Sequence, residues 1–274
     1  MRPSGSLEID AITFDFGNTL LPVDRASLRR VVEVTGQRLA ARLGPFTLED
    51  FLAIWGEERE RQFREEVPRF REVDIAERLV RVLARLRGVA APPGDVSWDQ
   101  AAAERHSTRD EIALGVTTYS DAFVEAMPVS AAVTEVLATL ATEHRLGILS
   151  NWPLAATVDR YAAAAGWLPY LTAIVVSQRV GTIKPHPAIF AAALEALGGP
   201  APARVLHVGD DWAADVVGAK AAGWRAAYLD ARPHDSPLPG SHRDGSVTPD
   251  LELSGLDELP SALARGRSGA STSR

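Results

Sequence analysis

The sequence predicts an α/β protein, in which a parallel sheet is interrupted by a long inserted helical segment. Three observations support this fold class. An apolar run rich in β-branched residues opens the chain, a block over 22–125 has helical periodicity and no convincing strand, and short apolar runs then alternate with helical stretches of about ten residues. Alternation of this kind is typical of βαβ crossovers, which join parallel strands.

The first apolar run, within 9–21, predicts a buried strand that stops at a carboxylate. Asp15 is followed at once by Gly17, Asn18 and Thr19. Ligand sites in open parallel sheets form beyond the carboxyl ends of the strands. Asp15 is therefore a candidate functional residue, and the competing interpretation is that it only caps a turn.

Helical spacing then continues through the inserted block. We expect its helices at 24–43, from Thr47 to 66, at 73–87, and at 97–126 with a middle weakened by Gly115 and Thr117. Thr47 with Asp50 three residues later is typical of a helix start. These features predict that residues 22–125 form a separate helical subdomain.

From residue 128 onwards strands and helices alternate. The expected strands are 145–151, 173–177, 204–210 and 225–230, with a short edge strand at 251–253. The expected helices are 130–143, 153–165, 187–197, 213–222 and 256–263, and 231–248 is expected to be a loop because it is rich in Pro, Gly, Ser and Asp. Residues 1–21 and 126–264 would therefore form the α/β core, and 265–274 a disordered tail.

The composition is that of an ordinary globular protein and excludes several classes. The net charge of -7 argues against a nucleic-acid partner, and no cysteine is present for disulfides or thiolate metal sites. The N-terminus lacks the apolar stretch of a signal peptide, and no apolar run reaches the length of a membrane span. We therefore expect a cytoplasmic protein with no membrane partner.

Polar side chains follow three of the expected strands. They are Asp15, the pair Ser150 and Asn151, and the pair Asp210 and Asp211; Lys184 lies between the second and third groups along the chain. In a parallel sheet these groups would converge on one edge. Clustered carboxylates favour a hard cation such as Mg²⁺. A carboxylate nucleophile is one route for phosphoryl transfer, with the hydroxyl and the lysine binding the phosphate oxygens.

These groups, in this order, resemble the four motifs of the haloacid dehalogenase-like (HAD) hydrolase superfamily. The matching segments are Asp15-Phe16-Gly17-Asn18-Thr19-Leu20, Ser150-Asn151, Lys184-Pro185 and Gly209-Asp210-Asp211-Trp212-Ala213-Ala214-Asp215. The resemblance spans about residues 9–230. It implies a Rossmann-like sheet with the first strand at its centre, and it makes the inserted block resemble the α-helical cap of this superfamily.

The resemblance also implies a role for each matching residue. Asp15 would be the nucleophile and a metal ligand, and Gly17 would offer its backbone carbonyl to Mg²⁺. Asp210 would be an acidic metal ligand, and Asp215 would complete the metal shell, with Asp211 as the alternative in that role or as a helix cap.

The remaining matches imply phosphate binding. Ser150 and Lys184 would act in catalysis and, with Asn151 and Thr19, would bind the substrate. Among other polar residues, His207 is expected to be a core histidine and His186 part of a loop.

The sequence departs from the phosphatase pattern at Gly17. Phosphatases of this superfamily usually carry a second aspartate there, which acts as general acid and base, a contribution worth about 10²–10⁴-fold in rate. Asp24 is a candidate substitute. The arginines Arg59, Arg61 and Arg64 could hold a substrate carboxylate, but an exposed, charged helix face is the commoner explanation for them.

The sequence thus favours a Mg²⁺-dependent phosphatase that hydrolyses a small phosphorylated metabolite through an aspartyl phosphate on Asp15. Two alternatives stay open. One is a 2-haloacid dehalogenase-like hydrolase, which also lacks the second aspartate but needs no metal, so that Asp210 and Asp215 argue against it. The other is a weakly active or non-catalytic binding protein. Phosphonate cleavage through a cap lysine is disfavoured because residues 22–125 contain no lysine.

Overall fold

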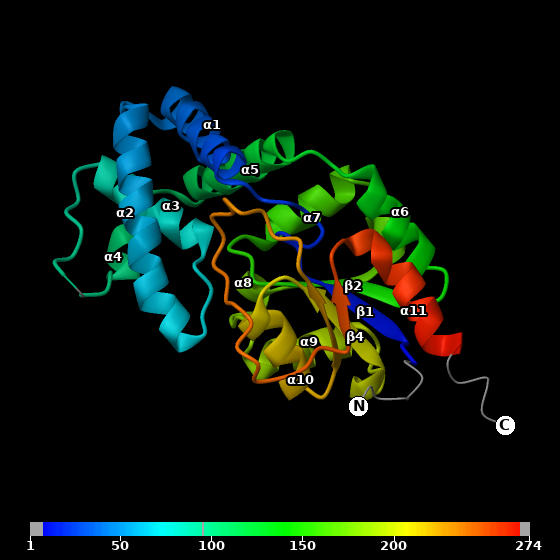
Figure 1. Cartoon of the computed structure of the whole chain (residues 1–274). Coiled ribbons are helices and arrows are strands. Elements are labelled where there is room, and N and C mark those ends of the chain that lie inside the picture. Colours follow the sequence, from blue (N-terminus) through cyan, green and yellow to red (C-terminus); the bar gives the residue numbers. More distant parts are fainter. Residues whose placement is uncertain (1–7, 95, 269–274) are drawn as a thin grey trace.

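The centre of the computed structural model is a six-stranded parallel sheet in the order β3-β2-β1-β4-β5-β6 (Figure 1). The structure describes residues 8–94 and 96–268. The strands are β1 (Ala11–Phe14), β2 (Arg145–Ser150), β3 (Leu171–Val176), β4 (Val205–Gly209), β5 (Arg225–Leu229) and β6 (Leu251–Leu253). The expected α/β fold, the central position of the first strand and the short edge strand are confirmed.

The register of the three central strands brings their carboxyl ends together. Phe14, the last residue of β1, pairs with Ile148 of β2 on one side and with Val208 of β4 on the other. All four residues of β1 are buried, as are all five of β4. These three strands, of which only Arg145 at the start of β2 is exposed, therefore deliver the polar residues that follow them to one edge of the sheet.

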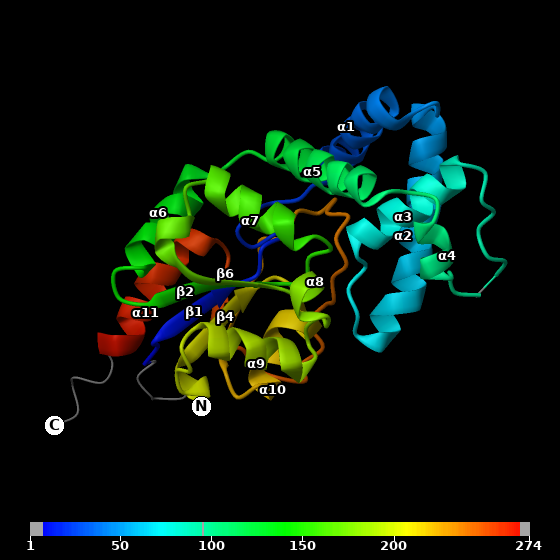
Figure 2. The ribbon, with the colours of Figure 1, turned by 180° about the vertical axis from the view of Figure 1, so that it is seen from behind.

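Helices cover both faces of the sheet. One face carries α6 (Ala131–Leu140), α7 (Ala155–Ala164) and α11 (Leu259–Ser268), and the other carries α9 (Pro187–Ala196) and α10 (Gly218–Ala221), as Figures 1 and 2 show. A π-helix, Trp212–Val217, runs directly into α10, so the expected helix at 213–222 is one continuous helical stretch of two kinds. The short helix α8 (Ser177–Val180) was not predicted, because four residues show no periodicity.

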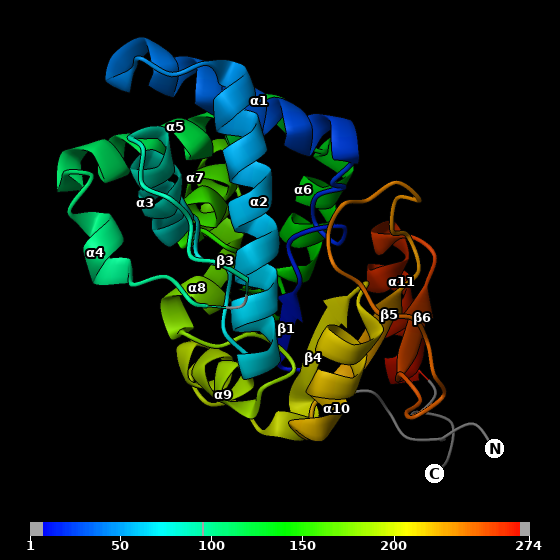
Figure 3. The same ribbon diagram turned by 90° about the vertical axis from the view of Figure 1, so that its left-hand side faces the viewer.

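The inserted block is helical, as predicted. Its helices are α1 (Arg25–Leu43), α2 (Leu48–Glu66), α3 (Ile75–Leu86), α4 (Gln100–Glu104) and α5 (Arg109–Ala126). They lie beyond the carboxyl edge of the sheet, with the long helix α2 crossing in front of it (Figure 3). A side chain caps each of the five helices at its N-terminus, and the residues are Asp24, Thr47, Asp74, Asp99 and Thr108.

The last helical stretch of the block differs from its prediction. The expected helical region at 97–126 consists of two helices, and the break lies just before Thr108, not at the expected weak point near Gly115. The Thr108 side chain forms a capping box with Glu111. Gly115 does not weaken α5. A Cβ at that position would lie 2.9 Å from Leu79 Cδ1, so the glycine lets α3 pack closely against α5. Tertiary packing here outweighs the low helix propensity of glycine.

Aromatic packing joins the helical block to the sheet. Phe16 lies just after β1. Its ring centroid is 6.2 Å from that of Phe123 of α5, 5.1 Å from that of Trp152 and 5.4 Å from that of Tyr161 of α7. These residues belong to one buried apolar cluster that extends from β1 to α2. The division into a core (1–21 and 126–264) and a cap (22–125) stays a prediction.

Two further expectations concern the ends and the surroundings of the chain. Helix α11 continues to Ser268, past the predicted start of the tail at 265, and residues 269–274 lie outside the described residues. Within the described part of the chain, no single helix combines the length and apolarity needed to cross a membrane. The pair α5 and α6 meets that test together, by length and composition, across a bend of 99°.

Candidate active site

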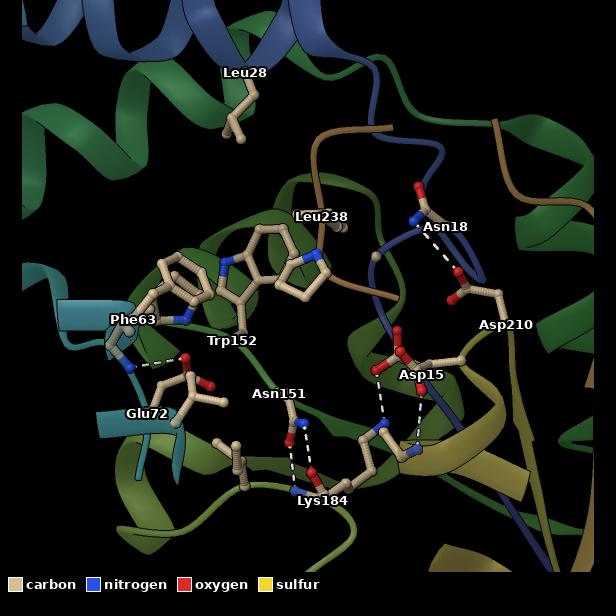
Figure 4. A pocket seen from close by; sticks show the side chains of 18 of the residues that line it. Asp15, Asn18, Leu28, Phe63, Glu72, Asn151, Trp152, Lys184, Asp210 and Leu238 are labelled. Atoms are coloured by element: carbon tan, nitrogen blue, oxygen red, sulfur yellow. Dashed lines mark hydrogen bonds and ion pairs between the residues drawn. The ribbon is translucent and has the colours of Figure 1, made fainter. Parts of the chain in front are cut away.

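A buried lysine ammonium ties together the residues that follow the central strands. Lys184 Nζ donates to Asp15 Oδ1 at 2.8 Å, to Asp215 Oδ1 at 2.6 Å and to the Leu149 carbonyl at 2.8 Å. Ser150 Oγ donates to the same Asp15 oxygen at 3.0 Å. Four residues from four separate segments therefore meet at the carboxyl edge of the sheet, as the sequence predicted. Figure 4 shows Lys184 and Asp15 of this group.

The ion pairs determine the charge state of this cluster. Burial by itself lowers the pKa of Lys184, but the charges of Asp15 and Asp215 outweigh it and raise that pKa above its usual value. Burial likewise raises the pKa of Asp215, but Lys184 and His207 overcome this effect and lower it overall. Lys184 is thus held as a cation and Asp215 as an anion.

Two opposing effects act on the pKa of Asp15, the candidate nucleophile. Burial raises the pKa of Asp15 to about 6, although the charge of Lys184 opposes the rise. Both hydrogen bonds to this carboxylate fall on Oδ1. Among the described residues, Oδ2 therefore has no hydrogen-bond donor to compete with a substrate.

Asp210 is the carboxyl group of the cluster whose ionised form is least favoured. Burial, together with the charges of Asp15 and Asp215, raises the pKa of Asp210 to about 8. Asn18 Nδ2 donates to its carboxylate at 3.3 Å, and Arg232 Nη1 forms an ion pair with it at 3.1 Å. One carboxylate oxygen from each of Asp15, Asp210 and Asp215 falls within a 4.8 Å span.

This donor set fits a divalent cation. Three buried carboxylates face one ammonium and one guanidinium, and the raised pKa of Asp210 shows that the cluster favours additional positive charge. Oxygen ligands of this kind suit Mg²⁺. Both oxygens of Asp215 already accept hydrogen bonds, from Lys184 and from the Asp211 backbone N–H at 2.9 Å, so this carboxylate also orients the lysine.

The loop 231–248 lies over this cluster, between β5 and β6, and rises toward the helical block (orange in Figure 1). Ser236 Oγ donates to Asn18 Oδ1 at 3.2 Å, and Arg232 Nη2 donates to the Pro239 carbonyl at 2.9 Å. A Cβ on Gly17 would lie 2.5 Å from Leu238 Cδ1 and 3.0 Å from Trp152 Cζ3. The space that an acid at position 17 would need is therefore filled.

Several expected residues have structural tasks. Asn151 binds the backbone of Lys184 through both its amide atoms, at 2.7 and 3.0 Å, and so positions the lysine. Thr19 Oγ1 faces Asp210 at 3.5 Å. Asp211 caps the following helix through Ala214 and also binds Ser241, which supports the helix-cap interpretation.

The substitute acid was a wrong suggestion. Asp24 caps α1, and the Ser27 backbone N–H lowers its pKa, whereas a general acid needs a raised one. Asp24 is not among the residues that line the cavity described next.

The two histidines were interpreted correctly. His186 caps α9, and His207 is buried between Thr13 and Asp215. His207 also lies 3.4 Å from Lys184 Nζ, a contact that the sequence did not reveal.

A cavity of about 220 Å³ extends from the carboxylates into the helical block. The sequence missed several residues that line it, among them Trp152, Arg232, Leu238, Glu72 and Arg78. Trp152 follows the Ser150-Asn151 pair directly and so had a positional signal. The others had none, because they reach the cavity only through the packing of distant segments.

Comparison with known proteins agrees with this geometry. A sequence model of the haloacid dehalogenase-like hydrolase family matches residues 9–223. The chain belongs to this family. It is therefore a hydrolase, and the resemblance drawn from the four motifs is confirmed.

Two curated relatives match part of this hydrolase. The chain is 30% identical over 151 residues to the pyrimidine 5'-nucleotidase YjjG of Escherichia coli. The aligned segment covers 53% of this chain and 63% of the relative. The chain is 33% identical over 117 residues to haloacid dehalogenase-like hydrolase domain-containing protein 3 of Danio rerio, covering 43% and 45%. The match thus spans less than two thirds of each curated relative.

A solved structure aligns over almost its whole length. The 2-haloacid dehalogenase of Pseudomonas syringae pv. Tomato DC3000 has a TM-score of 0.63 and 25% identity, over 94% of this chain and 99% of that one.

We predict that Mg²⁺ stabilises the hydrolase more at high than at low pH. The pKa of Asp210 is raised, so its contribution to metal-free stability is present at acid pH and is lost as pH rises through about 8. Mg²⁺ competes with that proton. Thermal unfolding should show a shift of several degrees on adding Mg²⁺ at pH 8.5 and little shift at pH 5.5.

The Asp210→Asn variant is the matched control, because it removes the titrating group and should lose the shift at both pH values. Equal shifts at the two pH values in the unmodified protein would contradict the prediction.

We also predict that Arg232 and Mg²⁺ compete for Asp210. The guanidinium occupies one oxygen of this carboxylate and would repel a nearby dication. Replacement Arg232→Met should tighten Mg²⁺ binding by about tenfold or more, measured by calorimetry at pH 8. Arg243→Met is the control, because Arg243 lies in the same loop and pairs with Glu252 instead. Unchanged or weaker binding in Arg232→Met would show that the two cations do not compete.

Proposed function

We propose that this hydrolase is a Mg²⁺-dependent phosphatase that acts on small phosphate monoesters through an aspartyl phosphate on Asp15. The observation that supports this most directly is the Asp15 carboxylate, whose Oδ1 is held by Ser150 and Lys184 while two further carboxylates lie beside it. The similarity to a pyrimidine 5'-nucleotidase supports a phosphorylated substrate.

The chemistry follows from the positions of the side chains. Asp15 Oδ2 attacks the phosphorus atom and the bond to the leaving oxygen breaks, which transfers the phosphoryl group to the carboxylate. Ser150 and Lys184 then face the oxygens of the transferred group and stabilise their charge. Attack by water on phosphorus releases phosphate and restores Asp15.

The metal would be held by Asp15, the Gly17 carbonyl, Asp210 and Asp215. When bound, Mg²⁺ supplies positive charge that neutralises the phosphate oxygens and the carboxylates together. Lys184, held charged by its two carboxylate partners, keeps Asp15 oriented throughout.

The leaving group receives no proton from position 17. Gly17 has no side chain, and Leu238 and Trp152 fill the space beside it with apolar atoms. We therefore expect the protein to favour esters with good leaving groups, such as aryl phosphates, over simple alkyl phosphates.

A second candidate is dehalogenation, which the structural similarity to a 2-haloacid dehalogenase favours. In that reaction Asp15 would attack carbon instead of phosphorus. The buried acidic pair Asp210 and Asp215 argues for the phosphatase, because it adds negative charge next to the nucleophile that only a cation offsets. Release of chloride from 2-chloropropionate in the presence of a chelator would favour the dehalogenase instead.

We predict that Asp15→Asn abolishes phosphate release from an aryl phosphate, since the amide cannot form the intermediate. The loss should exceed about 10³-fold, measured as Mg²⁺-dependent release of phosphate at saturating substrate. Asp121→Asn, which changes a surface carboxylate paired with Arg160, should leave the rate unchanged. Activity that survives in Asp15→Asn would refute the proposed nucleophile.

We predict that an acid at position 17 helps only when space is made for it. Gly17→Asp alone would require the end of the Leu238 side chain to move, because a Cβ at position 17 would lie 2.5 Å from Leu238 Cδ1. Leu238→Ala removes that contact and leaves Trp152 Cζ3, at 3.0 Å, as the nearest atom. The double variant should hydrolyse alkyl phosphates about tenfold or more faster than the Leu238→Ala single variant, measured as kcat. No gain in the double variant, with its fold intact by circular dichroism, would show that the missing acid does not limit the reaction.

A further inference from the structure

The helical block contributes to the cavity a buried arginine without an acidic partner among the described residues. Arg78, on α3, is 4% exposed and lines the cavity. Two other arginines on this helix differ from it: Arg81 forms an ion pair with Glu65 at 3.0 Å, and Arg85 pairs with Glu57 at 2.7 Å. Among the described residues, no carboxylate lies within ion-pair distance of Arg78.

Arg78 is held in one orientation by neutral groups. Its Nε donates to Gln62 Oε1 at 2.8 Å, and Gln62 Nε2 donates in turn to the Asp74 carbonyl at 3.0 Å. Its guanidinium stacks over Trp55, with Cζ 5.2 Å from the ring centroid. These contacts use one edge and one face of the guanidinium and leave the two Nη groups without a hydrogen-bond partner among the described residues.

An isolated charge of this kind is costly to bury. Burial lowers the pKa of Arg78 to about 10, so the group stays protonated at neutral pH. Glu72 also lines the cavity, but its carboxylate accepts hydrogen bonds from Ser177 and from the Val73 backbone N–H instead of pairing with Arg78. A charged side chain that is buried, oriented and unpaired is typical of a group kept for a ligand.

A second cation lines the same cavity. Arg59 of α2 stacks over Phe63, with Cζ 4.9 Å from the ring centroid, and makes a long contact of 3.5 Å to the Pro237 carbonyl. Its charge is close enough to lower the pKa of Arg78. The lining of the cavity is largely apolar and includes Tyr119, Leu28 and Trp152, whose buried Nε1 lacks a hydrogen-bond partner in the described structure.

We propose that Arg78, with Arg59 beside it, binds a second acidic group of the substrate, at the end opposite the phosphate that is cleaved. The substrate class is then a phosphate monoester with a flat, mainly apolar body and a carboxylate or a second phosphate at its far end. The two Nη groups of a guanidinium match two oxygens of either group. This inference rests on the proposed function, because it takes Asp15 as the site of cleavage.

The test compares aryl phosphates that differ only at the far end: phenyl phosphate, 4-carboxyphenyl phosphate and 1,4-phenylene bisphosphate. The full-length protein should have a KM at least about tenfold lower for one of the two doubly acidic substrates than for phenyl phosphate. In Arg78→Met that preference should disappear, while kcat and the KM for phenyl phosphate stay within about twofold. Whichever doubly acidic substrate is preferred identifies the acidic group.

The matched control is Arg64→Met, because Arg64 is exposed on α2 and is not among the cavity-lining residues. It should keep the preference. Arg59→Met should reduce the preference in part, and it keeps the test decisive if Arg78→Met does not fold. Equal KM values for all three substrates, or a preference that survives in both Arg78→Met and Arg59→Met, would overturn the proposal.

A binding measurement separates this inference from the proposed function. Quenching of tryptophan fluorescence by benzoate, with benzyl alcohol as the neutral comparison, requires no turnover. Selective binding of benzoate that is lost in Arg78→Met would support the acidic subsite even if no phosphate is released from any ester. Phosphate release without selective benzoate binding and without a preference for doubly acidic esters would retain the phosphatase and exclude the subsite.

Discussion

The ion pairs of Lys184 are the interaction on which the rest of the site depends. Its ammonium lies at the carboxyl edge of the three central strands, between Asp15 and Asp215, and the Lys184 side chain is almost fully buried. In this setting each charge needs the others, because an unpaired buried ion is strongly destabilising. Asn151 and His207 also contact Lys184. They position its ammonium, which in turn orients the Asp15 carboxylate.

One ammonium cannot neutralise three carboxylates, and the structure shows where the imbalance falls. Asp215 receives two hydrogen bonds on one oxygen and one on the other, whereas Asp210 has a raised pKa and draws in Arg232 from the loop that follows β5. That loop has two effects. Its Arg232 supplies a positive charge to Asp210. Its Leu238 lies against Gly17, so apolar atoms occupy the space in which an acid at position 17 would lie. The lack of a side chain at position 17 and the path of loop 231–248 therefore go together, because Leu238 of this loop occupies the space beside Gly17.

The sequence-based predictions were accurate where a local pattern determines the structure, and they failed where contacts between side chains determine it. Strands β1 and β4 were found because burial on both faces makes them mostly apolar, with Thr13 and His207 as the buried polar exceptions. The break before Thr108 was misplaced, because the low helix propensity of Gly115 looked decisive until its contact with Leu79 was known. Asp24 was suggested as an acid from its position near the site, but its local hydrogen bonds to Ser27 make it a helix cap.

The sequence by itself determined the fold class and the family, because four motifs at strand ends have a fixed order and parallel strands bring such ends to one edge. It also identified Asp15, Ser150, Lys184 and Asp210 as neighbours. Only the tertiary structure decided what surrounds them. Arg78 looks like any arginine on a charged helix, and its lack of an acidic partner arises from how α3 packs against α2. The burial of a side chain and its ion pairs depend on contacts between segments that are distant in the sequence, so a local sequence pattern does not predict them.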